Sequence, residues 1–208
     1  MEYFFYCRDK PDAMATRRSL VEPHWAFMDG YAAGMIARGP TLTDDNRITG
    51  SMHIVDVPDA AAARVFAYDE PFARADVYSE IIVHRWRNVL GRTMWQFDGT
   101  ATESRFMILA HGRPGAAPTA EQSAAQHAFF EQGDPACRII LRGPLLADDG
   151  EGWRGSALFA EATDRAAVER MVAAMPFVRA GLYREVEIHR WHFGGRDNAK
   201  GLVAATRP

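Results

Sequence analysis

The sequence predicts an α+β protein built from two tandem βαββαβ units that pack as an internal pseudo-dimer. The main observation is a gapless internal repeat: residues 71–86, PFARADVYSEIIVHRW, return as residues 176–191, PFVRAGLYREVEIHRW, with nine of sixteen positions identical. Such self-similarity indicates a duplicated unit. The second observation is length, because 208 residues suffice for two domains of about 100 residues each.

The third observation is the order of expected elements in the first half. Apolar patterning and turn residues predict strand, helix, strand, strand, helix and strand, which is the ferredoxin-like order. One face of such a sheet is covered by the two helices, and a second copy is the obvious cover for the other face. The expected strands are residues 3–7, 35–38, 51–57 and the end of the repeat, and the second helix is expected over 58–68.

The start of the first helix is left open by Pro23. If Pro23 marks the first turn, where its missing N–H costs nothing, His24 lies at the positive end of the helix dipole. If the helix begins nearer Arg17, Pro23 lies inside it and kinks it, and the dipole argument fails.

The second half repeats the same order. Its expected strands and helix include residues 105–110, 120–132 and 138–142. In this alignment His127 matches His24, and Gly143-Pro144 matches Gly39-Pro40. The predicted organisation is a first domain over 1–91, a connector over 92–104, a second domain over 105–193 and a polar tail over 194–208.

Composition narrows the classes of function. A formal net charge of −3 argues against a nucleic-acid partner. No run of 18 or more apolar residues predicts a membrane span, and the N-terminus lacks the features of a signal peptide. The two cysteines, Cys7 and Cys137, are not at equivalent positions of the repeats, so we expect no disulfide and a cytoplasmic location.

Asp9 and His24 form the sharpest candidate pair for chemistry. Asp9 follows the first strand, and His24 lies on the helix into which that strand leads. A carboxylate that accepts a hydrogen bond from one imidazole nitrogen fixes the tautomer and leaves the other nitrogen as a base. The alternative is that His24 is a structural histidine with its hydrogen bonds satisfied.

An ordered set of features resembles the YCII (YciI-like) family, a branch of the dimeric α/β-barrel superfamily. The set is an aromatic strand ending at Asp9, then Arg17, His24, Gly39-Pro40, Gly50-Ser51 and the Pro-Phe turn before a strand. The resemblance covers residues 2–87 well and 105–192 more loosely. It implies a His–Asp acid/base dyad, carried over as His24 with Asp9. One branch of the family eliminates chloride from a chlorinated hydroxyhydroquinone.

Three further residues are candidates for binding the substrate. Arg17 or Arg8 could hold an anionic group. Glu70 stands where the family has an aspartate before Pro-Phe. In the second half, Gly112 stands opposite Asp9 and Met175 opposite Glu70, so we expect a degenerate second site although His127 remains. Two pairs of residues are identical at equivalent positions of the repeats, His84 with His189 and Glu80 with Glu185. We interpret them as structural.

The sequence contains no Cys-x-x-Cys motif, no His-x-x-x-His motif on a helix and no phosphate-binding glycine loop, so we expect neither a metal nor a cofactor. The predicted function is a cofactor-free acid/base enzyme of lyase or isomerase type. Its expected substrate is a small cyclic or aromatic compound with hydroxyl or carbonyl groups. The alternative is a non-catalytic binding or regulatory module. Homodimerisation of the chain is left open.

Overall fold

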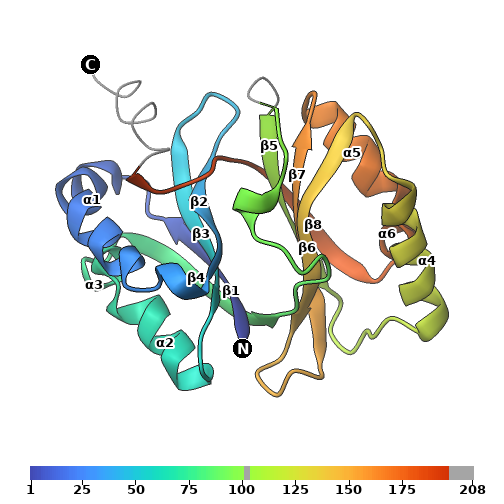
Figure 1. Ribbon diagram of the computed structural model, residues 1–208, viewed down its shortest axis with the longest axis horizontal. Coiled ribbons are helices and arrows are strands. Elements are labelled where there is room, and N and C mark those ends of the chain that lie inside the picture. Colours follow the sequence, from blue (N-terminus) through green and yellow to red (C-terminus); the bar gives the residue numbers. More distant parts are fainter. Residues whose placement is uncertain (101–103, 197–208) are drawn as a thin grey trace. The chain divides into compact units, whose positions relative to one another are not determined.

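The computed structural model describes residues 1–100 and 104–196, and its elements are shown in Figure 1. The helices are α1 (Met14–Asp29), α2 (Ala60–Asp69), α3 (Pro71–Arg74), α4 (Ala120–Gln132), α5 (Arg165–Ala174) and α6 (Pro176–Arg179), with two short 3-10 turns, η1 (Ala32–Gly34) and η2 (Met94–Gln96). The strands are β1 (Glu2–Asp9), β2 (Met35–Leu42), β3 (Ile48–Asp56), β4 (Tyr78–Trp86), β5 (Ser104–Gly112), β6 (Cys137–Leu146), β7 (Trp153–Ala162) and β8 (Tyr183–Trp191).

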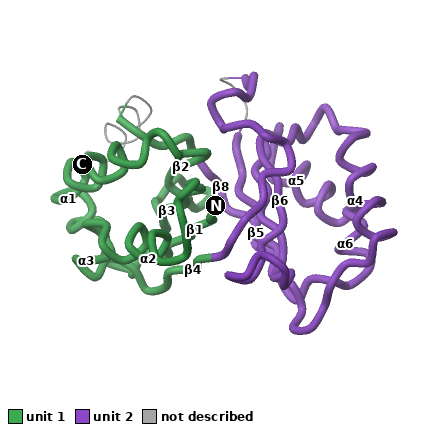
Figure 2. Tube along the Cα trace, turned by 60° about the horizontal axis from the view of Figure 1, so that its bottom comes forward, with its two compact units in different colours: residues 1–83, 192–208 green, residues 84–191 purple. Residues whose placement is uncertain are grey.

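The chain divides into two compact units, coloured separately in Figure 2. Unit 1 comprises residues 1–83 and 192–208, and unit 2 comprises residues 84–191. Each unit has the order strand, helix, two strands, helices, strand. The predicted fold class is therefore confirmed: the protein is α+β, with two tandem ferredoxin-like units of the dimeric α/β-barrel type.

The two units have the same strand order. In unit 1, β1 and β2 both pair antiparallel with β3, and β4 neighbours β1. In unit 2, β5 and β6 pair with β7, and β8 pairs with β5. The matching order shows that the repeat seen in the sequence duplicates a whole sheet with its helices, since one strand alone would not reproduce the pairing.

One unit boundary falls inside β4, after Val83, and the other falls directly after the last residue of β8. Arg85 and Trp86 at the end of β4 pair with β6 of unit 2. The N–H of His192 donates to Pro40 of β2 at 3.2 Å, and that of Gly194 donates to Arg38 at 2.9 Å, which places these residues in unit 1. Most of the predicted tail, residues 197–208, lies outside the described residues.

The core of unit 1 lies between the sheet and its helices. Figure 1 shows α1, α2 and α3 on the same face of this sheet. Phe66 of α2 packs on Phe5 of β1, with ring centroids 4.5 Å apart, and on Tyr31 at 4.9 Å. The buried Val55 and Met28 complete the same cluster. This burial of aromatic surface stabilises the helices on the sheet and fixes the position of α1.

The repeated Gly-Ser step has a steric cause. A Cβ atom at Gly50 would lie 2.3 Å from the carbonyl oxygen of Cys7, and one at Gly155 would lie 2.1 Å from that of Ala110. Only glycine therefore allows the third strand of each unit to approach its first strand this closely. The serines that follow, Ser51 and Ser156, are buried.

Helix α1 begins nine residues before Pro23, so Pro23 lies inside the helix. His24 therefore lies in the interior of the helix and not at the positive end of its dipole.

Both cysteines are free and buried. Within residues 1–100 and 104–196, no helix is both long and apolar enough to cross a membrane.

The second helix of each unit is capped in the same way. The carboxylate of Asp59 accepts from the N–H of Ala62 at 2.8 Å, and that of Asp164 accepts from the N–H of Ala167 at 2.7 Å. Replacing such a cap by alanine costs about 1 kcal/mol.

We therefore expect Asp59→Ala and Asp164→Ala each to lower the free energy of unfolding by about 1 kcal/mol in urea titrations. The exposed Asp12 caps no helix of this fold, and Asp12→Ala serves as the matched control. Equal stability of all three variants would mean that these caps do not stabilise the second helices.

Candidate functional site

A buried histidine and a buried glutamate meet between α1 and α3 of unit 1. Nδ1 of His24 lies 2.8 Å from Oε2 of Glu70, and the side chains are only 9% and 3% exposed. The His24 ring also stacks on Phe72, with ring centroids 4.1 Å apart and planes 14° from parallel. The imidazole is therefore held both by a hydrogen bond and by a flat aromatic surface.

Glu70 is held in place because it caps α3. Its carboxylate accepts from the N–H of Phe72 at 3.1 Å and from the N–H of Ala73 at 3.0 Å. Pro71 follows at the first helical position, where no N–H is needed. The sequence Glu-Pro-Phe thus fixes a carboxylate and an aromatic ring next to each other, and both contact His24.

The protonation states follow from burial and hydrogen bonding. Burial lowers the pKa of His24 below 6.5, although the Glu70 carboxylate acts to raise it. Burial acts to raise the pKa of Glu70, but the hydrogen bonds from His24 and the Phe72 N–H outweigh it, and the pKa falls below 4.5. An ionised carboxylate can only accept, so Nδ1 of the neutral His24 carries the proton. Nε2 is then free to act as a base.

The predicted pairing of His24 with Asp9 is wrong. Asp9 instead accepts a hydrogen bond from Nη1 of Arg17 at 2.6 Å, and Nη2 of Arg17 donates to Ser51 at 2.7 Å. Arg17 precedes His24 by two helical turns, so both side chains project from one face of α1. The Arg17 guanidinium binds the Asp9 carboxylate because a buried charge is costly unless it is paired with an opposite charge.

Asp9 and Arg17 nevertheless border the histidine. The Arg17 guanidinium lies 4.6 Å from the centroid of Phe72, the ring on which His24 stacks. Burial raises the pKa of Asp9 above 3.8, against the effect of Arg17. Oδ2 of Asp9 is buried, and no described residue hydrogen-bonds to it. The site therefore contains a carboxylate oxygen with an unused capacity to accept.

Arg8 lies outside this cluster. Its Nε donates to the exposed Glu80 at 2.7 Å, and its guanidinium lies over the ring of Tyr6. Of the three residues predicted to bind substrate, Arg17 is at the site and Glu70 is the histidine's partner, whereas Arg8 is not brought to His24.

Sequence reasoning missed His53, which lies on β3 and is 4% exposed. Its ring centroid is 5.9 Å from that of His24. Burial lowers the pKa of His53 well below 6.5. The available signal was the alternation of β3, because His53 lies two residues after Ser51 and so faces the same side of the sheet.

In unit 2, Gln126 takes the position that the alignment gave to His127. Gln126 is buried, its Oε1 accepts from the N–H of Phe177 at 3.1 Å, and its Nε2 lies 3.7 Å from the sulfur of Met175. Phe177 and Met175 are the counterparts in unit 2 of Phe72 and Glu70. The His127 side chain is 55% exposed and pairs with Glu131 at 3.1 Å. The predicted equivalence of His127 with His24 is therefore wrong by one residue.

The rest of the unit 2 site is filled with apolar groups. The Trp153 ring packs against Phe177 at 6.1 Å and Tyr183 at 5.5 Å between centroids. A Cβ atom at Gly112, the counterpart of Asp9, would lie 2.6 Å from the Trp153 ring. An aspartate at position 112 would collide with the indole of Trp153, so the tryptophan in its present place excludes an acid at this position.

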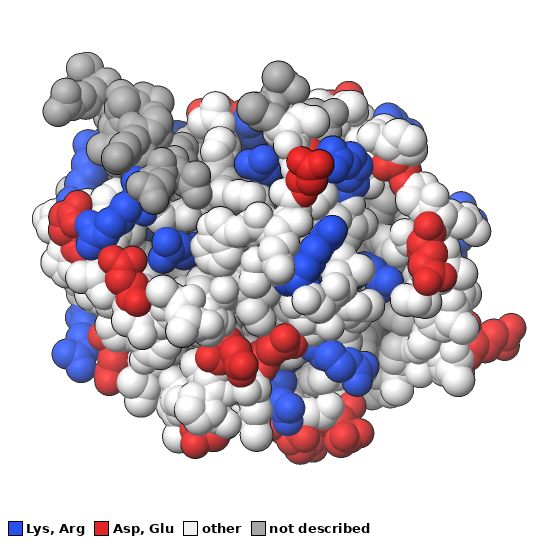
Figure 3. Space-filling model, in the orientation of Figure 1, with Lys and Arg blue, Asp and Glu red and all other residues white. Residues whose placement is uncertain are grey.

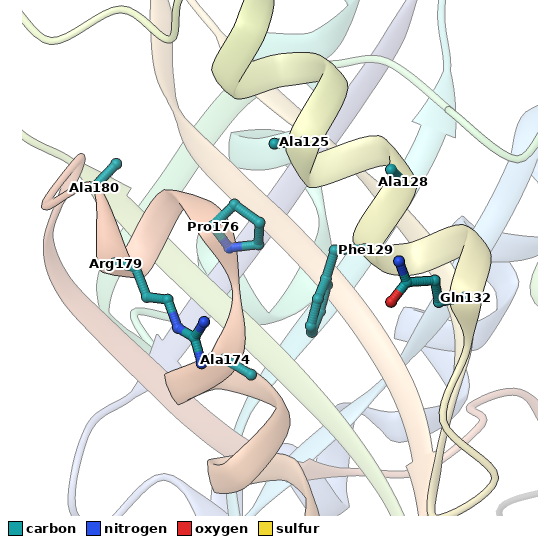
Figure 4. A pocket seen from close by; sticks show the side chains of 8 residues that line it. All are labelled: Ala125, Ala128, Phe129, Gln132, Ala174, Pro176, Arg179 and Ala180. Carbon is teal, nitrogen blue, oxygen red and sulfur yellow. The ribbon is translucent and has the colours of Figure 1, made fainter.

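Unit 2 has a separate shallow pocket between α4 and the α5–α6 segment (Figure 4). Phe129 and Pro176 form its floor, with Gln132 and Arg179 at its edges. Gln126 is not among its lining residues.

On the face shown in Figure 3, acidic and basic residues are interspersed, without a broad patch of one sign. Within the described part of the chain, no three His, Cys, Asp or Glu side chains are arranged to hold a metal ion.

Several solved structures share this fold. A putative chlorite dismutase is 12% identical, with full coverage of both chains and a TM-score of 0.58. A putative monooxygenase from Fusobacterium nucleatum is 9% identical, covering 92% of this chain and 91% of the other with a TM-score of 0.53.

A 5-chloro-2-hydroxyhydroquinone dehydrochlorinase from Burkholderia phenoliruptrix, solved with 2,5-dihydroxybenzoquinone, is 28% identical. The match covers 44% of this chain and 99% of that chain, with a TM-score of 0.41. No curated protein matches the chain. The model of the YCII-related domain matches residues 1–87 and again residues 104–192, and the chain belongs to the YCII-related family.

Proposed function

We propose that unit 1 is a cofactor-free acid/base site of lyase or isomerase type. Its substrate would be a small cyclic or aromatic compound with hydroxyl or carbonyl groups. His24 removes a proton from the substrate through Nε2, and Glu70 holds the imidazole in the tautomer that this step requires. Glu70 thus takes the orienting role that the sequence assigned to Asp9.

The observation that supports this proposal most strongly is the buried 2.8 Å hydrogen bond between Nδ1 of His24 and Glu70. An orienting carboxylate on one imidazole nitrogen is the arrangement of a general base. When Nε2 takes a proton, the imidazolium that forms is stabilised by the ionised carboxylate on its other side. The proton can then be returned to a leaving group or to another atom of the same substrate.

The neighbours of His24 suit a partly anionic ligand. The Phe72 ring is covered by the imidazole of His24 and by the guanidinium of Arg17, so it holds these two groups in place. Arg17 provides a buried positive charge close to His24, and an acidic hydroxyl of a substrate at His24 would be attracted to it. Asp9 keeps the guanidinium in position.

Unit 2 provides an internal comparison. Gln126 cannot act as a base, Met175 cannot orient one, and Trp153 fills the adjoining space. We propose that unit 2 has no acid/base chemistry at this position. The alternative function, a binding module without catalysis, predicts instead that ligands bind in unit 1 and are released unchanged.

Both functions are tested with a panel of hydroxylated ring compounds incubated in D₂O and followed by proton NMR. The acid/base proposal predicts exchange or elimination with the wild type. His24→Ala should lower the rate by about 10²–10⁴-fold, the usual contribution of a general base. His127→Ala is the matched control and should keep the wild-type rate. Circular dichroism verifies folding of each variant. A folded His24→Ala variant with full activity would contradict the proposed base.

The pH dependence should identify the partner of His24. The neutral imidazole is the active form, and burial lowers its pKa, so kcat/KM should rise with pH to a plateau with its midpoint below pH 6.5. In Glu70→Gln the carboxylate that raises this pKa is gone, so the midpoint should move to lower pH and the plateau should fall. Asp9 hydrogen-bonds to Arg17 and not to His24, so Asp9→Asn should move the midpoint less than Glu70→Gln does. A midpoint that moves in Asp9→Asn and not in Glu70→Gln would restore Asp9 as the partner.

A further inference from the structure

His53 lies beside the proposed base without taking part in its hydrogen bond. It is on β3, on the face covered by the helices, two residues after Ser51. The His53 and His24 ring centroids are 5.9 Å apart, with planes at 59°. The rings of Phe66 and His53 pack edge to face, at 5.5 Å between centroids. Two imidazoles from different elements, α1 and β3, therefore lie next to each other.

The hydrogen bonds among the described residues do not use the His53 ring, whereas its neighbours each have a partner: His24 bonds to Glu70, and Arg17 bonds to Asp9 and Ser51. Buried polar groups in proteins nearly always have a partner. A histidine used only for packing could be replaced by an apolar residue of similar size without loss of a hydrogen bond.

Unit 2 has made this replacement. His53 is paired across the sheet with Phe5 and Arg38, and Leu158 is paired in the same way with Ile108 and Arg142. Leu158 is 1% exposed and belongs to the apolar core of unit 2. The sheet thus accepts a leucine at this position. The histidine is present only in the unit that also has a histidine–glutamate pair.

We propose that His53 binds an oxygen atom of the substrate and so holds the ring against His24. The inference rests on the proposed function of unit 1. The 5.9 Å between the two ring centroids is compatible with a carbonyl oxygen bound to His53 and the adjacent carbon facing His24.

The chemical role of His53 follows from its neutrality. Burial and the nearby positive charge of Arg38 and Arg17 keep His53 unprotonated, so it carries one N–H and one acceptor nitrogen. Donation of that N–H to a carbonyl oxygen would stabilise the negative charge that moves onto this oxygen when His24 removes a proton from the adjacent carbon. The proton goes to Nε2 of His24, and the electron pair of the broken C–H bond goes to the enolate.

The test uses ¹⁵N-histidine NMR of the full chain with 2,5-dihydroxybenzoquinone as the probe, a planar ring with two acidic hydroxyls and two carbonyls. His53→Leu copies the residue of unit 2, His53→Gln keeps a hydrogen-bond donor, and the exposed His127→Leu is the matched control. Each variant identifies the ring signals of its own histidine, His24→Ala identifies those of His24, and the titrations give the dissociation constant of the probe.

Binding of the probe should shift the ring nitrogens of both His24 and His53. His53→Leu should raise the dissociation constant about tenfold, the effect of losing one hydrogen bond. His53→Gln should recover part of this loss, and His127→Leu should bind like the wild type. If His53→Leu does not fold, the wild-type shifts, assigned with His53→Gln, decide the question. Shifts at His24 with none at His53 would overturn this inference and leave the proposed function standing. Shifts at neither histidine would overturn both.

Discussion

The site depends on one buried carboxylate that has two tasks. Glu70 accepts the N–H groups at the start of α3, and it accepts the proton-bearing nitrogen of His24. An unsatisfied buried donor costs about 1–3 kcal/mol, so neither task is optional for the fold. Unit 2 shows the consequence, because Met175 has no carboxylate to accept the N–H of Phe177, and Oε1 of Gln126 on α4 accepts it instead. The helix turn is preserved in both units, but the buried histidine is present only where the cap is an acid.

Burial then decides the charges around this carboxylate. For His24, the loss of water outweighs the attraction of Glu70, and the imidazole stays neutral. For Glu70, the hydrogen bonds outweigh the loss of water, and the carboxyl stays ionised. A neutral base beside an ionised acceptor is ready to take a proton, since the charge that stabilises the product is already in place. Arg17 and Asp9 form a second buried pair close by.

The sequence predicts the architecture more fully than the site. The repeat over residues 71–86 and 176–191 identifies two equivalent units, because nine identities without a gap report a shared backbone. Two acids, Asp9 and Glu70, follow elements that end near His24, and spacing does not tell which one reaches it. Arg17 binds Asp9 in the folded chain, and this leaves Glu70 as the partner of His24. Residue type matches His127 with His24, but the buried residue at this position of unit 2 is Gln126.

The central claim is that the two units share a fold but differ in chemistry, with the site placed at His24 and Glu70. A crystal structure of the chain grown with 2,5-dihydroxybenzoquinone tests it most directly. The account predicts electron density for the ring in unit 1, with an oxygen or carbon atom in reach of Nε2 of His24. It also predicts that Trp153 fills the space beside Gly112, the counterpart of Asp9 in unit 2. Density for the ring beside Gln126 and none beside His24 would contradict the account.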